Sequence, residues 1–391
     1  MDNQLLIFQE LDELLQRACK ELQIGNAHYE QAKTSYMAVA DWLATDEERF
    51  PDSDIDIYPQ GSLRIGTTVK PLHQQEFDLD LVCELKLDWK SFDNPIEVLD
   101  AIESRLKENQ TYKKMVEKKN RCIRLNYKRD FHMDILPACP IKDSDNGCVK
   151  VPDRKLEDWK DSNPRGYAKW FDNIAENYIE GPTTFLFEKA AKIEKLPYVE
   201  PVEIKPPLKR AVQLIKRYRD IYYKENIENA PISIVLTTIA GIVYQRQGSV
   251  NDTITCILNG IIEMAPEKGI LKVQNPMNAE ELLSERWETN PDLYNEFISF
   301  IQEFRDKWEA LNTSIGSKGI VEISEILKEM FGEEPINKGF EKAALFNESL
   351  RDTNKLGITS AGVVVATSLP KTSLGATRPT INIKKNTFFG D

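Results

Sequence analysis

The stretch Gln60–Leu85, QGSLRIGTTVKPLHQQEFDLDLVCEL, decides the fold, because it sets two aspartates into an otherwise apolar strand. Side chains alternate along a strand, so Asp78 and Asp80 share one face while Phe77 and Leu79 point to the other. Like charges this close raise each other's pKa unless a cation lies between them. The pair therefore indicates either a platform for a divalent metal or the solvated face of an edge strand.

A third aspartate favours the metal platform. Asp134 lies in the apolar segment FHMDILPAC, where an isolated carboxylate would be costly to bury. If strand pairing places Asp134 beside Asp78 and Asp80, the three carboxylates can hold two Mg²⁺ or Mn²⁺ ions roughly 3.5 to 4 Å apart. That arrangement suits in-line phosphoryl transfer, with Asp134 as general base or as the metal ligand nearest the attacking hydroxyl.

The turn that precedes the acidic pair contains a Gly-Ser sequence. Gly61 permits close approach of the backbone, and Ser62 is a favourable helix N-cap. A strand ending near Gln60 and a helix starting near Leu63 would direct backbone N–H groups at a phosphate. Asp78 follows Ser62 by sixteen residues, a spacing that is more specific than a Gly-Ser pair alone.

The size and charge of the chain limit its function. At 391 residues it exceeds the roughly 250 to 300 at which single hydrophobic cores stop growing, so we expect two lobes with a cleft between them. The 51 basic and 63 acidic residues give a net charge of −12, which argues against a long nucleic-acid substrate but permits local basic pockets for small phosphates.

The expected setting is the cytoplasm. No apolar run reaches the ~20 residues that span a membrane, and the start MDNQLLIFQE is acidic and amphipathic, unlike a secretory signal. The six cysteines form no CxxC pair, which indicates reduced thiols.

Apolar periodicity predicts the layout of secondary structure. Helices are expected up to about Ala44 and over Asn94–Lys107, and a four-proline linker lies within residues 192–209. The chain is helical from Leu208, and Asn290 caps a long helix whose apolar stripe should pack in a core. Strands are expected at Phe77–Leu85, Arg121–Lys128 and Phe131–Ala138.

The motifs QGSLRIGTTVKP, EFDLDLV and FHMDILPA resemble the DNA polymerase β-like nucleotidyltransferase superfamily. Within it they are most similar to the bacterial relatives of cyclic GMP-AMP synthase, the CD-NTases of CBASS antiphage systems. The motif match covers about Gln60–Ala138. The resemblance implies an α+β fold, with a mixed β-sheet core and an α-helical second lobe that enclose the active site between them. We expect the core with N-terminal helices at 1–195, the helical lobe at 206–352 and a flexible tail at 353–391.

The resemblance also implies which residues bind nucleotide. Lys216 in LIKRY and Ser233 in APISIVL match the lysine and serine that hold the donor triphosphate, and Gln60, Gly61 and Ser62 form the other phosphate contact. Lys216 lies with Lys209 along the border of an apolar helix stripe. The alternative interpretation is that both are surface lysines whose stems cover apolar area.

The activity implied is template-independent synthesis of a cyclic di- or trinucleotide messenger from ATP, often with GTP or another nucleoside triphosphate, with release of pyrophosphate. Some CBASS enzymes are conjugated at the carboxyl terminus by a ubiquitin-like system. Their tails commonly end in a small residue, whereas this chain ends in Gly390-Asp391.

Two alternatives to this activity stay open. The same chemistry could act on RNA, tRNA or a small molecule, although an RNA-binding version would need a basic surface stripe. An inactive nucleotide-binding scaffold is the other alternative. The complete aspartate set argues against the scaffold, because a relic has no need to retain three mutually repelling acids.

Overall fold

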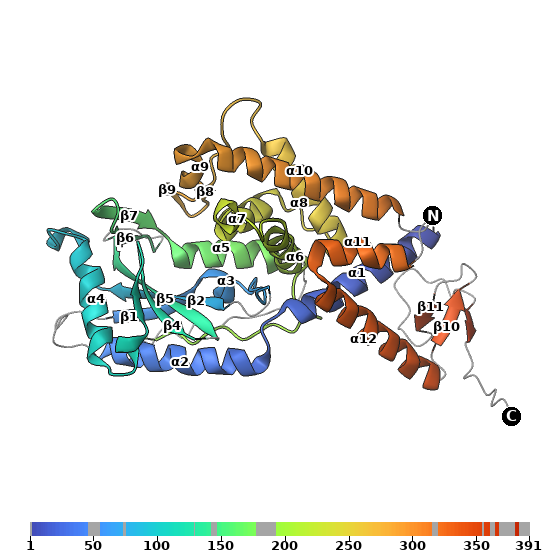
Figure 1. Ribbon diagram of the computed structural model, residues 1–391, viewed down its shortest axis with the longest axis horizontal. Coiled ribbons are helices and arrows are strands. Elements are labelled where there is room, and N and C mark those ends of the chain that lie inside the picture. Colours follow the sequence, from blue (N-terminus) through green and yellow to red (C-terminus); the bar gives the residue numbers. More distant parts are fainter. Residues whose placement is uncertain are drawn as a thin grey trace.

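The computed structural model describes residues 2–45, 55–72, 76–128, 130–141, 147–176, 193–314, 320–353, 356–359, 364–366 and 380–382. A seven-stranded sheet forms the core of one lobe, with strand order β1-β2-β5-β4-β3 and with β6 and β7 added beyond β5 (Figure 1). β2 and β5 are parallel neighbours, and every other pairing in this sheet is antiparallel. The strands are β1 (Ile55–Gln60), β2 (Phe77–Leu85), β3 (Val116–Lys118), β4 (Ile123–Tyr127), β5 (Phe131–Pro140), β6 (Val149–Asp153) and β7 (Asp158–Ser162).

Helices cover the apolar face of this sheet. α2 (Asn26–Ala44) and α4 (Ile96–Glu108) share one buried core with it, and Phe77, Leu79 and Leu81 are buried there. Two short 3₁₀ helices, Trp89–Ser91 and Tyr112–Lys114, flank α4. The alternation in β2 thus orients its apolar residues as the sequence predicts, which leaves the aspartates on the opposite face.

The second lobe is mainly helical. The predicted apolar stripe of the helix Pro291–Ser314 is buried as expected, from Leu293 to Leu311. Its elements are α5 (Pro164–Glu176), α6 (Pro207–Tyr222), α7 (Ser233–Val243), α8 (Val250–Met264), α9 (Glu285–Thr289), α10 (Pro291–Ser314), α11 (Ile320–Phe331), α12 (Glu333–Asp352), a 3₁₀ turn (Ile227–Asn229) and the hairpin β8 (Gln274–Asn275) and β9 (Asn278–Leu282).

The division into lobes differs from the expected boundaries in two places: α5, expected within the core at 1–195, shares the buried core of the helical lobe, and so does the first helix. α1 (Asp2–Leu22) lies along α12 and also contacts α8, and Leu15 and Leu22 are buried in the same core as Trp308 (Figure 1). The first helix therefore belongs with the helical lobe and not with the sheet. The physical reason is long-range, because its apolar stripe completes a core that chain segments hundreds of residues away supply.

The segment expected to be a flexible tail contains regular structure. β10 (Leu356–Thr359), β11 (Val364–Ala366) and β12 (Thr380–Asn382) form an antiparallel sheet in the order β11-β10-β12. Val364, Val365 and Ile381 supply the β-branched residues that favour strands. Gly390-Asp391 lies outside the described residues. Within the part of the chain that is described, no helix has both the length and the apolarity to cross a bilayer.

Candidate active site

Strand pairing assembles the three aspartates. The parallel register of β2 and β5 places Asp80 opposite Asp134 and Asp78 opposite His132. On the other side of β2, Gln60 at the end of β1 pairs with Asp80. The prediction that pairing brings Asp134 beside the acidic pair is confirmed.

Gly61 makes the tight turn from β1 toward the site. Its φ of +67° is in the left-handed region, and a Cβ built on it would lie 2.1 Å from Oδ2 of Asp80. Only glycine fits such an approach without displacing the carboxylate. The predicted close approach of the backbone at this turn is therefore present, and the group that it approaches here is the second aspartate.

The predicted cap role of Ser62 is wrong. α3 (Gly61–Arg64) begins at Gly61, not near Leu63, and Gln60 precedes it as N-cap. Because the chain bends at Gly61, Ser62 already lies inside the single turn of α3. Its Oγ lies 3.2 Å from Oγ1 of Thr68.

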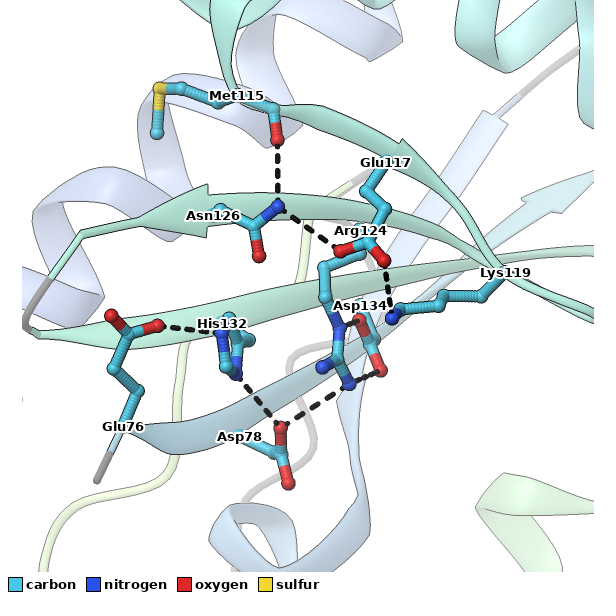
Figure 2. A network of polar contacts seen from close by, with 9 residues as sticks. All are labelled: Glu76, Asp78, Met115, Glu117, Lys119, Arg124, Asn126, His132 and Asp134. Atoms are coloured by element: carbon cyan, nitrogen blue, oxygen red, sulfur yellow. Dashed lines mark hydrogen bonds and ion pairs between the residues drawn. The ribbon is translucent and has the colours of Figure 1, made fainter.

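Arg124 is a site residue that the sequence analysis missed. From β4, its Nε and Nη2 donate to the two oxygens of Asp134 at 2.7 and 2.8 Å, and Nη2 lies 3.4 Å from Oδ1 of Asp78 (Figure 2). His132 approaches the same Asp78 oxygen at 3.7 Å through Nδ1 and contacts Glu76 at 2.6 Å through Nε2. The guanidinium thus supplies positive charge between two of the three carboxylates.

The electrostatics of this floor favour a cation. Burial, together with the charges of Asp78 and Asp134, raises the pKa of Asp80 to about 8. Desolvation, with the charge of Asp134 as a further cause, also raises the pKa of Asp78, although the Asp78 side chain is 59% exposed. Among the described residues, no three His, Cys, Asp or Glu side chains converge as a preformed metal site. Carboxylate oxygens are the ligands that a hard cation prefers, so the chemistry of Asp78 and Asp80 fits one, while Asp134 is engaged by Arg124 in this arrangement.

The helical lobe contributes cationic and hydroxyl groups to the same cleft. Lys216 on α6 is 4% exposed, and burial, with Arg219 nearby, lowers its pKa to about 7. Arg219, one turn further along α6, donates to Oγ of Ser233 at 2.6 Å and pairs with Asp220 at 2.8 Å. Lys216 and Ser233, both predicted, thus line one wall together with Arg219, which was not predicted.

Lys209 has a different position from Lys216. It is also 4% exposed, so the interpretation of the two lysines as solvated surface residues is wrong. Its Nζ contacts Asp172 and Glu200, each at 3.2 Å, instead of the cleft. The seven-residue spacing put both lysines on one border of the stripe, but only Lys216 reaches the site.

The cleft between the two walls encloses about 1080 Å³. Single small-molecule sites occupy about 300 to 1,000 Å³, so this volume is at the upper end of that range. Its floor includes Gln60, Gly61, Ser62, Asp78 and Asp80, and its opposite wall includes Lys216, Arg219 and Ser233.

Known proteins resemble this chain in sequence. Residues 10–174 match the model of the Second Messenger Oligonucleotide or Dinucleotide Synthetase domain. A c-di-GMP synthase from Roseivirga ehrenbergii is 38% identical over 386 residues, which is 98% of this chain and 98% of that protein. The cyclic dinucleotide synthase CdnG from Bradyrhizobium diazoefficiens is 24% identical over 92% of this chain and 89% of its own length. The chain belongs to the CD-NTase family.

Solved CD-NTase structures share the fold. The GTP complex of the B. diazoefficiens CD-NTase CdnG matches with a TM-score of 0.68 and 22% identity, over 86% of this chain and 99% of that one. The Vibrio cholerae cyclic AMP-GMP synthase DncV matches with a TM-score of 0.53 and 15% identity, over 84% and 87%. The expected fold class, a polymerase β-like core with a helical lobe, is confirmed. As a CD-NTase, the protein is a nucleotidyltransferase that synthesises cyclic dinucleotides.

Proposed function

We propose that this CD-NTase makes cyclic di-GMP from two molecules of GTP, with release of two pyrophosphates. The observation that carries the proposal is one cleft in which Asp78 and Asp80 face Lys216 and Ser233. Guanine in both positions is supported by the 38% identical relative, which is named a c-di-GMP synthase. Two other products would contradict the assignment of cyclic di-GMP. One is a cyclic dinucleotide that contains adenine, and the other is a cyclic trinucleotide.

Asp78, Asp80 and Asp134 would hold the divalent cations, Mg²⁺ or Mn²⁺. When bound, the metal supplies the chemistry of two-metal phosphoryl transfer, in which the attacking hydroxyl loses its proton more readily and the triphosphate charge is neutralised. The raised pKa of Asp80 supports this assignment, because a bound cation favours the ionised form of an acid that lies near two like charges.

Side chains of the protein bind the triphosphate and position the attacking hydroxyl. Lys216, Arg219 and Ser233 hold the donor triphosphate, and the turn at Gly61 and Ser62 lies on the other side of it. A ribose hydroxyl of the second GTP attacks the α-phosphorus, the bond to the β-phosphate breaks, and pyrophosphate leaves beside the cationic wall. Asp134, whose orientation Arg124 fixes, either accepts the hydroxyl proton or is the metal ligand nearest that hydroxyl. A second transfer of the same kind closes the ring.

The test incubates the purified protein with each nucleoside triphosphate alone and in pairs, with Mg²⁺ and no primer. Phosphatase-resistant products are then identified by mass spectrometry. We expect cyclic di-GMP from GTP alone. A product that requires both ATP and GTP would replace the guanine assignment, and activity that appears only with added RNA, tRNA or a small-molecule acceptor would refute the cyclase proposal. Metal binding without turnover on any acceptor would favour the scaffold alternative.

We also propose that the enzyme is cytoplasmic. We propose further that its carboxyl terminus is a substrate for a ubiquitin-like conjugation system. Its support is the family membership. Cell fractionation tests the first part. Mass spectrometry of the C-terminal peptide, purified from cells that carry the neighbouring genes, tests the second, and an unmodified peptide under phage challenge would refute it.

A further inference from the structure

The loop that follows α3, Gly66–Lys70, is held by side chains of the helical lobe. Four of its carbonyl oxygens accept hydrogen bonds from four residues in or just before α6: Lys205 to Gly66 at 3.0 Å, Lys216 to Thr67 at 3.3 Å, Gln213 to Thr68 at 2.7 Å and Arg217 to Lys70 at 3.1 Å. All four donor residues are buried, with exposures between 0 and 5%. The two lobes are therefore joined directly behind the proposed phosphate site.

Thr67 differs from its neighbours in this loop, because its side chain also takes part. Its Oγ1 lies 3.0 Å from Nζ of Lys216, in addition to the contact through its carbonyl. The threonine is fully buried, whereas Lys216 lines the cavity. The hydroxyl of Thr67 therefore acts on a ligand in the cleft through the lysine.

The contact leaves the lysine able to bind a ligand. A lysine ammonium has three N–H donors, and Thr67 accepts two of them. One donor remains for a group in the cavity. A lysine stem otherwise loses about 1.5 to 2 kcal/mol of rotamer freedom when it is fixed, so a side chain that is already fixed binds more tightly.

Thr67 also forms a hydrogen bond with the Gly61–Ser62 turn. Its backbone N–H donates to the carbonyl of Ser62 at 2.9 Å. A continuous path of hydrogen bonds thus runs from the Gly61–Ser62 turn through Thr67 to Lys216. Thr67 therefore fixes the position of Lys216 relative to the Gly61–Ser62 turn, and both are proposed to contact the triphosphate.

We infer that Thr67 is a positioning residue that aims the ammonium of Lys216 at the donor triphosphate and sets its distance from the Gly61–Ser62 turn. The inference rests on the proposed function, in which Lys216 binds that triphosphate. The competing explanation is that Thr67 only closes the interface between the lobes, as Gln213 does through Thr68.

The test is a double-mutant cycle on the full-length protein. Thr67→Val removes the hydroxyl at nearly constant volume, Thr67→Ser keeps it, and Lys216→Met removes the ammonium. Gln213→Met is the matched control, because it breaks the adjacent interlobe bond without touching Lys216. For each variant we would measure the Kd of a non-hydrolysable GTP analogue, kcat and KM for GTP, and the thermal unfolding midpoint.

We expect Thr67→Val to raise Kd and KM about 10-fold, in line with the loss of a hydrogen bond to a charged group, while kcat changes less. Thr67→Ser should restore most of the affinity. In the Lys216→Met background, Thr67→Val should add nothing, and Gln213→Met should lower the unfolding midpoint without a comparable change in Kd.

An additive effect of Thr67→Val in the Lys216→Met background, or an equal effect of Gln213→Met on Kd, would overturn the inference and leave the proposed function intact. Unchanged GTP binding by Lys216→Met would refute the lysine's assigned role and the inference together. If the wild type binds GTP but makes no cyclic product, the proposed function fails, and the binding cycle still decides whether Thr67 positions the lysine.

Discussion

Arg124 contacts both carboxylate oxygens of Asp134 across the pairing of β4 with β5, so the third aspartate of the predicted site is charge-paired from the adjacent strand. A guanidinium and a divalent metal are alternative sources of positive charge for the same carboxylates. The stability of the apoprotein and its response to metal should therefore be coupled at this arginine.

Replacing Arg124 by Met should lower the free energy of unfolding in EDTA by about 1.5 to 3 kcal/mol, because Asp134 loses its charge-assisted partner. Mn²⁺ should restore part of this loss and raise the unfolding midpoint of the variant more than that of the wild type. The control is Arg154→Met, whose arginine pairs with Asp100 at 3.1 Å. Equal metal responses of the two variants would show that Arg124 and the metal do not share a site.

Gly61→Ala should abolish most activity, because the new Cβ would collide with Oδ2 of Asp80. The matched control is Gly269→Ala. Gly269 also has a positive φ, +92°, but a Cβ there meets nothing within 4 Å. Both variants carry backbone strain of order 1 kcal/mol, so both should lose some thermal stability. Comparable activity of the two variants would show that the approach of Gly61 to Asp80 is not required.

Asp80→Asn and Asp78→Asn should each eliminate the cyclic product and leave the fold intact. The pH dependence of stability gives a separate test at Asp80. Its pKa is raised to about 8 from an unfolded value near 3.9, so the folded state loses stability as pH rises between these values. Without metal, the unfolding midpoint of Asp80→Asn should therefore exceed that of the wild type increasingly from pH 5 to about pH 8, and the difference should level off above that pH. A constant difference would contradict the raised pKa.

Binding of the triphosphate should take up a proton at Lys216. Its pKa is lowered to about 7 in the protein without ligand, so the amine is mostly neutral above that pH. A bound triphosphate favours the charged form, and affinity should fall as pH rises from 7 toward 10. Calorimetric titration with a non-hydrolysable GTP analogue, in two buffers of different ionisation enthalpy at pH 8.5, measures the uptake. In the wild type we expect Lys216 to take up close to one proton when the analogue binds. In Lys216→Met this uptake should be lost.

Much of the site could be predicted from local sequence pattern. Alternation in β2 and β5 fixed the face of Asp78, Asp80 and Asp134, because a strand repeats every two residues. The same rule applied to Ile123 and Leu125 would have placed Arg124 on the acidic face. Arg219 follows Lys216 by three residues, so helical spacing carried a signal for it as well.

Other features depend on contacts between distant segments. The pattern of α1 predicts an amphipathic helix but cannot say that its partners are α12 and α8, which follow more than 200 residues later. No pattern in the sequence around Thr67 marks it as a site residue. Its contact with Lys216 exists only because α6 packs against the loop that contains it. The start of α3 at Gly61 depends on the left-handed φ of that residue, which glycine permits but does not require.

We propose that the carboxylate floor and the cationic wall enclose one active site. Crystals grown with Mn²⁺ and a non-hydrolysable GTP analogue test it directly, because anomalous scattering locates the metal independently of the nucleotide. We expect manganese against Asp78 and Asp80 and a triphosphate in contact with Lys216 and Ser233. Manganese elsewhere, or a triphosphate bound away from Lys216 with the floor empty, would contradict it.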